Sequence, residues 1–169
     1  KSRTRRENSL FVVEGRKEIG HCLDAGYKVR TLFACPEIIP ERELEKIAER
    51  CGEDCTIVNV PAHLYEKIAY RGSTEGVIAE AEIIDKSLGD IKLRENPLVI
   101  VLESVEKPGN LGAVLRTADA ADADAVIVCD PLTDLYNPNL IRSSLGATFT
   151  RQVVAASSGP PRRARLSNG

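Results

Sequence analysis

Short apolar runs alternate with helix-forming segments along the second half of the chain, and this alternation constrains the fold more than any other feature. The apolar runs occupy residues 98–102, 125–129 and 152–156. Between them, residues 111–121 and 138–145 have the composition and spacing of helices. A βαβαβ order predicts right-handed crossovers and a parallel sheet. The uninterrupted apolar run at 98–102 also predicts a strand buried on both faces.

The first 85 residues alternate in a similar way. Their apolar and β-branched runs predict strands, and their amphipathic stretches predict helices. Gly26 and Gly52 follow two of the helical stretches, and glycine commonly ends a helix. We therefore predict a compact α/β unit. The expected strands are 10–13, 29–34, 56–60 and 77–84, and the expected helices are 16–25, 40–50 and one that opens at Pro61.

The chain is therefore predicted to have two α/β units. Residues 1–85 form the first unit, 86–97 are a polar linker, 98–156 form the second unit, and 157–169 are an irregular tail rich in serine, proline and arginine. A parallel sheet of three strands without later helices leaves apolar surface uncovered. We therefore expect the second unit to be incomplete.

The composition excludes several classes of protein. A hydrophobic fraction of 43% is enough for a packed core, whereas aromatic residues make up only 4%, which argues against a protein built mainly on aromatic stacking platforms. The five cysteines have no disulfide or metal-binding spacing, so we expect reduced thiols, no metal and a cytoplasmic location. No apolar run reaches the roughly 20 residues that cross a bilayer, so no membrane partner is expected.

The stretch Glu103 to Ala118, ESVEKPGNLGAVLRTA, is the best candidate for a site because it follows a strand and opens a helix. Ligands of parallel sheets usually bind at this carboxyl edge. We expect Pro108 and Gly109 to form a turn, Asn110 to cap the helix, and Gly112 to allow a close backbone approach. Arg116 lies a little under two helical turns beyond Asn110, within reach of the same crevice.

An ordinary capped helix with a solvated arginine would give the same pattern. The spacing is neither GxGxxG nor a P-loop, so no nucleotide-cofactor motif is present. The residues alone therefore leave a functional and a purely structural interpretation open.

Three stretches resemble one family. PGNLGAVLRTADAADADAVIV, at 108–128, is similar to the first signature motif of the SpoU (TrmH) family of RNA 2′-O-ribose methyltransferases, which belong to the SPOUT class. NPNLIRSSLGATF, at 137–149, resembles the segment that follows the family's second strand. FVVEGRKEI at 11–19, together with GVIA at 76–79, is similar to the family's amino-terminal RNA-substrate-binding domain. The resemblance covers residues 1–156.

The resemblance implies a fold, a cofactor and a catalytic pair. It implies a small substrate-binding domain followed by a Rossmann-like parallel sheet with a trefoil knot, which binds S-adenosylmethionine, usually in a homodimer. Asn110 and Arg116 would be the catalytic pair of the first motif. Because arginine stays protonated, we expect Arg116 to clamp a phosphate and polarise the 2′-hydroxyl, with Asn110 positioning Arg116 or the loop.

The family's second and third motifs would follow Ala156, where this sequence reads SSGPPRRARLSNG. No cofactor-binding residue is therefore assigned. We expect the trefoil-knot domain to be incomplete and the 169-residue chain to be inactive by itself.

The resemblance also implies that the first unit binds ribosomal or transfer RNA, largely by backbone and shape. Two other functions stay open. One is a non-catalytic RNA-binding module, and the other is a small-molecule α/β enzyme that binds a phosphate at the Asn110 loop. The candidate RNA contacts, each of which is otherwise a solvated surface arginine, are Arg3, Arg5, Arg6, Arg16 and Arg71.

Overall fold

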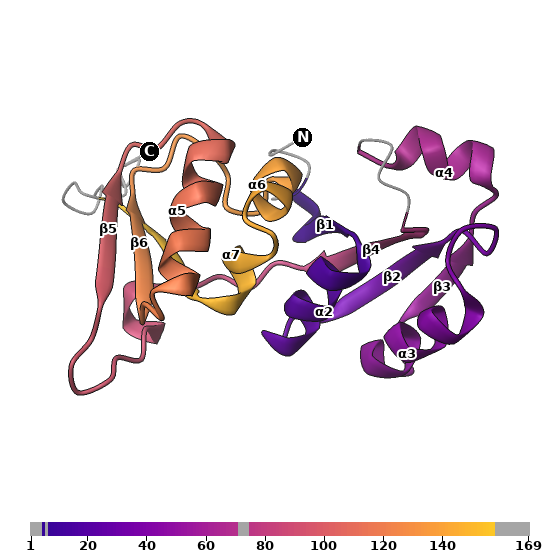
Figure 1. Cartoon of the computed structure of the whole chain (residues 1–169), viewed down its shortest axis with the longest axis horizontal. Coiled ribbons are helices and arrows are strands. Elements are labelled where there is room, and N and C mark those ends of the chain that lie inside the picture. Colours follow the sequence, from indigo (N-terminus) through magenta and orange to yellow (C-terminus); the bar gives the residue numbers. More distant parts are fainter. Residues whose placement is uncertain (1–4, 6, 71–74, 158–169) are drawn as a thin grey trace, which may run out of the picture.

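The computed structural model describes residue 5 and residues 7–70 and 75–157. It contains a four-stranded sheet and a three-stranded sheet, which lie at opposite ends of the long axis (Figure 1). The strands are β1 (Leu10–Glu14), β2 (Val29–Ala34), β3 (Thr56–Asn59), β4 (Val77–Glu82), β5 (Val99–Glu103), β6 (Ala125–Cys129) and β7 (Gln152–Ala156). The helices are α2 (Arg16–Asp24), α3 (Glu41–Cys51), α4 (Ala62–Ile68), α5 (Pro108–Ala120), α6 (Pro138–Ser143) and α7 (Ala147–Thr150), with a 3-10 turn, η1, at Leu88–Asp90.

The first sheet has the strand order β1-β4-β2-β3. Strand β4 is antiparallel to both β1 and β2, while β2 and β3 are parallel. Along β1, Phe11 and Val13 are fully buried and share a core with Ile19 of α2 and Ile47 of α3. Val12 points to the other face and is exposed, as the alternation of side chains along a strand requires.

Proline and glycine set the limits of the helices in this unit. Helix α3 begins directly after Pro40 and ends at Gly52, whose φ of 82° is a left-handed conformation that favours glycine. Helix α4 likewise begins directly after Pro61. Both helices therefore start one residue later than the sequence predicts, because each proline adopts an extended conformation outside the helix.

The second sheet confirms the expected βαβαβ order. Strands β5, β6 and β7 are parallel neighbours in that order. Helices α5, α6 and α7 lie on the side of this sheet that faces the first unit (Figure 1). The prediction that 98–102 forms a strand buried on both faces is wrong. Strand β5 is an edge strand and Val101 is 62% exposed, because the opposite face has no described helix over it.

The start of α5 corrects a second prediction. The helix begins at Pro108, not at residue 111, with Lys107 as the preceding residue. Proline is favoured at the first helical position because its missing N–H needs no partner there. Asn110 is consequently the third residue of the helix and does not cap it.

The two units share one core. Ile141 of α6 and Phe149 of α7 are buried among the core residues of the first unit. The ring centroid of Phe149 lies 5.9 Å from that of Phe11 and 5.3 Å from that of Tyr27. Aromatic pairs at such distances add to the stabilisation from buried area.

The segment between β4 and β5 is bound to the second unit. Arg94 donates hydrogen bonds to Asp124, and Gln152 exchanges hydrogen bonds with the backbone of Lys92. A capping box between Ser87 and Asp90 closes η1. In the described part of the chain, no helix is long and apolar enough to cross a membrane.

Candidate functional site

Helices α5 and α6 touch at Gly112 and Ser143. A methyl group on Gly112 would lie 2.8 Å from the carbonyl carbon of Ser143, so only glycine fits without a shift. The hydroxyl of Ser143 donates to the carbonyl of Pro108 at 3.1 Å. The close backbone approach expected at Gly112 is therefore present, and its neighbour is helix α6.

Arg116 of α5 also contacts Ser143 of α6. Its Nη1 donates to the carbonyl oxygen of Ser143. Pro108, Gly112 and Arg116 follow one another at intervals of four residues, so they lie on one face of α5 and all reach Ser143. Arg116 is exposed, and no ion pair holds it among the described residues.

Asn110 is exposed near the start of α5, on a different face of the helix. It lies two residues from Pro108, which corresponds to about 200° around the helix axis. Within the described residues Asn110 and Arg116 are not hydrogen-bonded to each other. The carbonyl of Ser143, and not the Asn110 amide, orients the Arg116 guanidinium in this structure.

A groove of about 1270 Å³ separates the first sheet from the segment that links β6 to α6. Leu10, Val12 and Ile78 line the side formed by the first sheet, and Pro131–Asn139, Arg142 and Leu145 line the opposite side. Arg142 follows Asn139 by three residues on α6, so both side chains lie along the rim of this groove.

Hydrogen bonds between described residues cross between the two units around the groove. Nε and Nη2 of Arg5 donate to Oδ2 of Asp134 at 2.9 and 2.7 Å. The Tyr136 hydroxyl donates to the carbonyl of Ile84 at 2.6 Å. Nδ2 of Asn139 donates to the Tyr70 hydroxyl at 2.6 Å. The segment that follows β6 is therefore fixed against the first unit.

Burial changes the ionisation of groups beside the groove. It raises the pKa of the Tyr27 and Tyr136 phenols, so both stay protonated at neutral pH. It also lowers the pKa of Lys86, whose Nζ lies 4.9 Å from the centroid of the Tyr27 ring. The carboxylates of Glu14, Glu18 and Glu80 also line the groove.

The arginines expected to contact RNA have different surroundings. Arg5 is ion-paired with Asp134 and its side chain is only 16% exposed. Nε of Arg16 lies 3.7 Å from Glu75 Oε2, and this pair is well exposed to solvent. Arg3, Arg6 and Arg71 lie outside the described residues. Of the predicted contacts that are described, Arg16 is the one that an RNA phosphate reaches with less rearrangement.

Sequence reasoning missed four residues of this region. Arg142 and Ser143 lie within the NPNLIRSSLGATF stretch but had no assigned role, and Tyr70 and Asn139 were not considered. The position of Arg142 within a family-like stretch was the available signal. The Tyr70–Asn139 hydrogen bond joins residues 69 positions apart, and no local pattern predicts it.

The described residues do not form a cradle for S-adenosylmethionine beside α5. A methyl group on Gly109 would meet open space. The buried polar atoms that lack a partner in the described structure, Glu14 Oε1 and Tyr65 Oη, both belong to the first unit. We therefore assign no cofactor contact. No cluster of metal-binding side chains occurs among the described residues either.

Two family models match the chain in the order of its two units. Residues 1–79 match an MRM3-like substrate binding domain, and residues 97–160 match the SpoU rRNA methylase family. The second match contains both Asn110 and Arg116 on α5 as well as the whole of α6.

Similar proteins include two 23S rRNA ribose methyltransferases. The 23S rRNA (uridine(2479)-2′-O)-methyltransferase of Streptomyces viridochromogenes is 32% identical over 147 residues, which cover 85% of this chain and 50% of the relative. The 23S rRNA (guanosine(2553)-2′-O)-methyltransferase RlmP of Bacillus subtilis (strain 168) is 26% identical over 150 residues, covering 89% and 56%. The chain spans about half the length of these relatives.

Solved structures agree with these matches. An AdoMet-bound rRNA methyltransferase from Sinorhizobium meliloti has a TM-score of 0.81 and 28% identity, covering 94% of this chain and 58% of that one. The SpoU methyltransferase AviRb from Streptomyces viridochromogenes, in complex with AdoMet, has a TM-score of 0.78 and 27% identity, covering 95% and 58%.

The two matched domains, a substrate-binding domain followed by a methylase domain, come in the same order as the two α/β units of the fold. The chain belongs to the SpoU methylase family, whose members bind S-adenosylmethionine, and it carries an MRM3-like substrate-binding domain ahead of its methylase domain.

Proposed function

We propose that this chain is part of an enzyme that transfers a methyl group from S-adenosylmethionine to a ribose 2′-hydroxyl of ribosomal RNA. The observation that carries the proposal is Arg116, an exposed arginine without a carboxylate partner in the described structure, which the carbonyl of Ser143 holds at the contact between α5 and α6. The 23S rRNA ribose methyltransferases among the similar proteins support ribosomal RNA as the substrate.

Arg116 has a defined task in this proposal. A ribose hydroxyl is a weak nucleophile, and its oxygen must attack the methyl group of the cofactor in line. A guanidinium does not act as a simple base, because it stays protonated. Arg116 instead binds the phosphate next to the reacting ribose and polarises the hydroxyl, while Ser143 limits the orientations of the guanidinium.

Finer features of the proposal rest on the family resemblance and on the sequence. We include transfer RNA as an alternative substrate, a homodimer as the working assembly, and a cytoplasmic location. These three features stay predictions.

The test is a map of ribose methylation in ribosomal RNA from a strain that lacks the gene. We expect one 2′-O-methyl group to disappear, detected as a new site of alkaline cleavage. The wild-type gene should restore it. A gene with Arg116→Ala should restore it at a rate lower by about 100-fold or more, because a positioned charge that stabilises the transition state typically contributes that much.

Arg42→Ala is the matched control for this test, because Arg42 is also exposed but lies on α3, away from α5. That variant should restore methylation fully. If every ribose methyl group of the ribosomal RNA persists in the deletion strain, ribosomal RNA is not the substrate. If Arg116→Ala restores methylation at the wild-type rate, the role of Arg116 is wrong.

A further inference from the structure

Among the described residues, Tyr70 is the only well-exposed aromatic side chain. The sequence has four tyrosines, three phenylalanines and no tryptophan. Tyr70 is 48% exposed, and it also lines the groove. The others are buried or partly buried in the two cores of the first unit, and they are Phe11, Tyr27, Phe33, Tyr65, Tyr136 and Phe149.

Hydrogen bonds hold Tyr70 at both of its ends. Its backbone N–H donates to Oε2 of Glu14 at 2.8 Å. Its hydroxyl accepts from Nδ2 of Asn139 at 2.6 Å. Glu14 belongs to β1 and Asn139 to α6, so both units fix the ring at the rim of the groove. An exposed ring that is already fixed loses little conformational freedom when a ligand stacks on it.

A free cation lies next to the residue that holds this ring. Arg142 is exposed and lies on α6 three residues beyond Asn139, so their side chains share a face of the helix. No ion pair involves Arg142 in the described part of the chain. Arg142 also precedes Ser143, whose carbonyl holds Arg116. Helix α6 therefore connects the exposed ring to the candidate catalytic arginine.

The charged side chains around the groove favour different positions for a phosphate and for a base. Five carboxylates line the side of the groove formed by the first unit, and they belong to Glu14, Glu18, Glu75, Glu80 and Asp85. They outnumber the two cations there, Arg5, which is paired with Asp134, and Lys86, so this side repels a phosphate. A neutral nucleobase does not meet that repulsion. A single RNA strand can therefore keep its phosphates on the α6 side, at Arg142, while one base reaches the ring of Tyr70.

We propose that Tyr70 is a stacking platform for an unpaired base of the RNA and that Arg142 binds a phosphate of the same strand. This proposal rests on the proposed function, because it takes RNA as the ligand. It agrees with the low aromatic content, since one fixed aromatic ring is enough to bind one base.

The experiment measures how the full 169-residue chain binds a fluorescently labelled single-stranded RNA, by anisotropy at several salt concentrations. Tyr70→Leu should raise Kd by about 10- to 100-fold, because it keeps an apolar side chain and removes the aromatic face. Tyr70→Phe keeps the ring and should stay within about threefold of the wild type. Neither change should alter the slope of log K against log [salt].

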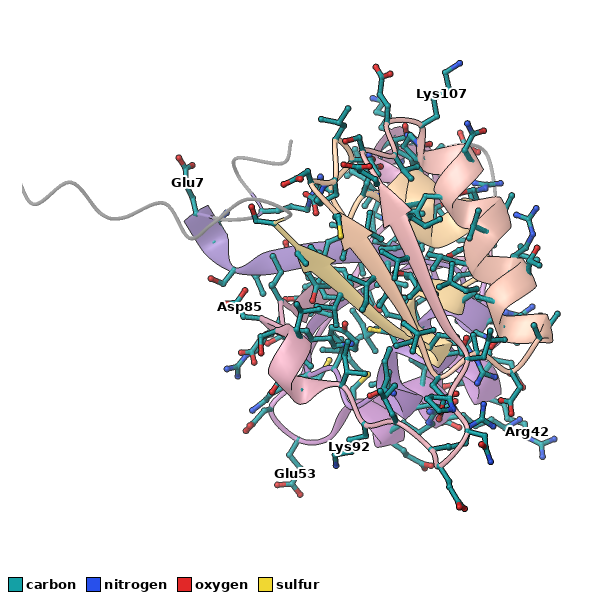
Figure 2. The ribbon with its side chains drawn as sticks, turned by 90° about the vertical axis from the view of Figure 1, so that its left-hand side faces the viewer. Glu7, Arg42, Glu53, Asp85, Lys92 and Lys107 are labelled. Carbon is teal, nitrogen blue, oxygen red and sulfur yellow. The ribbon has the colours of Figure 1, made fainter. Side chains whose placement is uncertain are left out.

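Arg142→Ala should act differently. Removal of one phosphate contact on a single strand lowers the steepness of the salt dependence by about 0.7. The matched controls are Leu93→Ala and Arg42→Ala on α3, because both residues are exposed and neither lines the groove. Figure 2 labels Arg42 and shows its side chain pointing away from the body of the molecule. Both controls should match the wild type in Kd and slope.

Three results would overturn the proposal. A Tyr70→Leu affinity equal to that of the wild type removes the stacking role, and an unchanged salt slope in Arg142→Ala removes the phosphate contact. A wild-type chain without salt-dependent RNA affinity overturns this proposal and the RNA-binding part of the proposed function together. If Arg116→Ala fails to restore methylation in the gene-deletion strain while both variants here bind normally, only this proposal fails.

Discussion

Asp124 is an almost fully buried carboxylate at the junction between the β4–β5 segment and the second sheet. Its Oδ1 accepts from Nε of Arg94 at 2.7 Å, and its Oδ2 accepts from the backbone N–H of Leu98 at 2.9 Å. The hydrogen bonds from Arg94, followed by that from Leu98, hold the pKa of Asp124 well below its usual range.

This lowered pKa predicts a stability that depends on pH. A carboxyl whose pKa is lower in the folded state stabilises the fold above its unfolded pKa of about 3.9, and the stabilisation is lost as the pH falls. Asp124→Asn should therefore lower the thermal unfolding midpoint at pH 7. The difference from the wild type should narrow below about pH 4. Thermal unfolding followed by circular dichroism measures both effects. The measurements run from about pH 3, below the unfolded pKa, to about pH 7, above it.

Asp54→Asn is the matched control, because Asp54 pairs with Lys28 on the surface at 2.7 Å and its side chain is well exposed. Solvent screens such a pair, so the midpoint should hardly move. A wild-type midpoint for Asp124→Asn at pH 7 would contradict the role given to Asp124.

Single residues also mark the limit of what the sequence predicts about the site. Asn110 and Arg116 could be chosen because both lie in one short stretch that resembles the family's first motif, and such a motif is a local property. Arg5 was expected to face RNA, but it pairs with Asp134, a residue 129 positions away. Such a partner is set by how the two units pack, which no local pattern contains.

At the scale of the elements, the contact between α5 and α6 depends on one missing side chain. A methyl group at Gly112 would force Ser143 to shift, because the nearest atoms belong to its backbone as well as its hydroxyl. Gly112→Ala should therefore destabilise the fold by about 1–3 kcal/mol, as overpacking typically does. Urea unfolding measures the change.

Gly109→Ala is the control from the same helix, because a methyl group there meets open space. Alanine is the better helix former, so this variant should be unchanged or more stable by up to about 1 kcal/mol. If the two alanine variants have equal free energies of unfolding, helix α6 shifts to accommodate a methyl group at Gly112 without loss of stability.

The elements themselves were largely predictable. Apolar periodicity located every described strand, proline and glycine located the limits of α3 within a residue, and proline located the start of α4. The exposure of β5 was not predictable, because a continuous apolar run looks the same in a central strand and in an edge strand. The four-residue helix α7 escaped prediction, since it is too short to show a helical period.

For the molecule as a whole, Phe149 joins the two units. Its ring is almost fully buried against Phe11 and Tyr27, although it belongs to the second unit. We expect one cooperative unfolding transition in the wild type. Phe149→Ala should cost about 3–5 kcal/mol and split the transition in two, because it empties the shared core. Differential scanning calorimetry measures both effects.

Leu132→Ala is the control for this change, because Leu132 is a large apolar residue of the same unit that lies mostly in solvent. It should leave both the midpoint and the single transition unchanged. A single, unshifted transition in Phe149→Ala would mean that the shared core does not couple the units. The sequence had suggested two separate units, since nothing in residues 137–149 shows that Ile141 and Phe149 complete a core built from residues 11–81.

The shared core also has a consequence for synthesis on the ribosome. Strands β1 to β4 emerge first, but the core they enclose lacks Ile141 and Phe149 until the chain has grown past helices α6 and α7. A nascent chain that ends after β4 therefore exposes the rings of Phe11 and Tyr27, which the later residues cover. Exposed apolar surface of this kind is what chaperones bind, so the first unit depends on protection from the end of its own translation until Phe149 has been made.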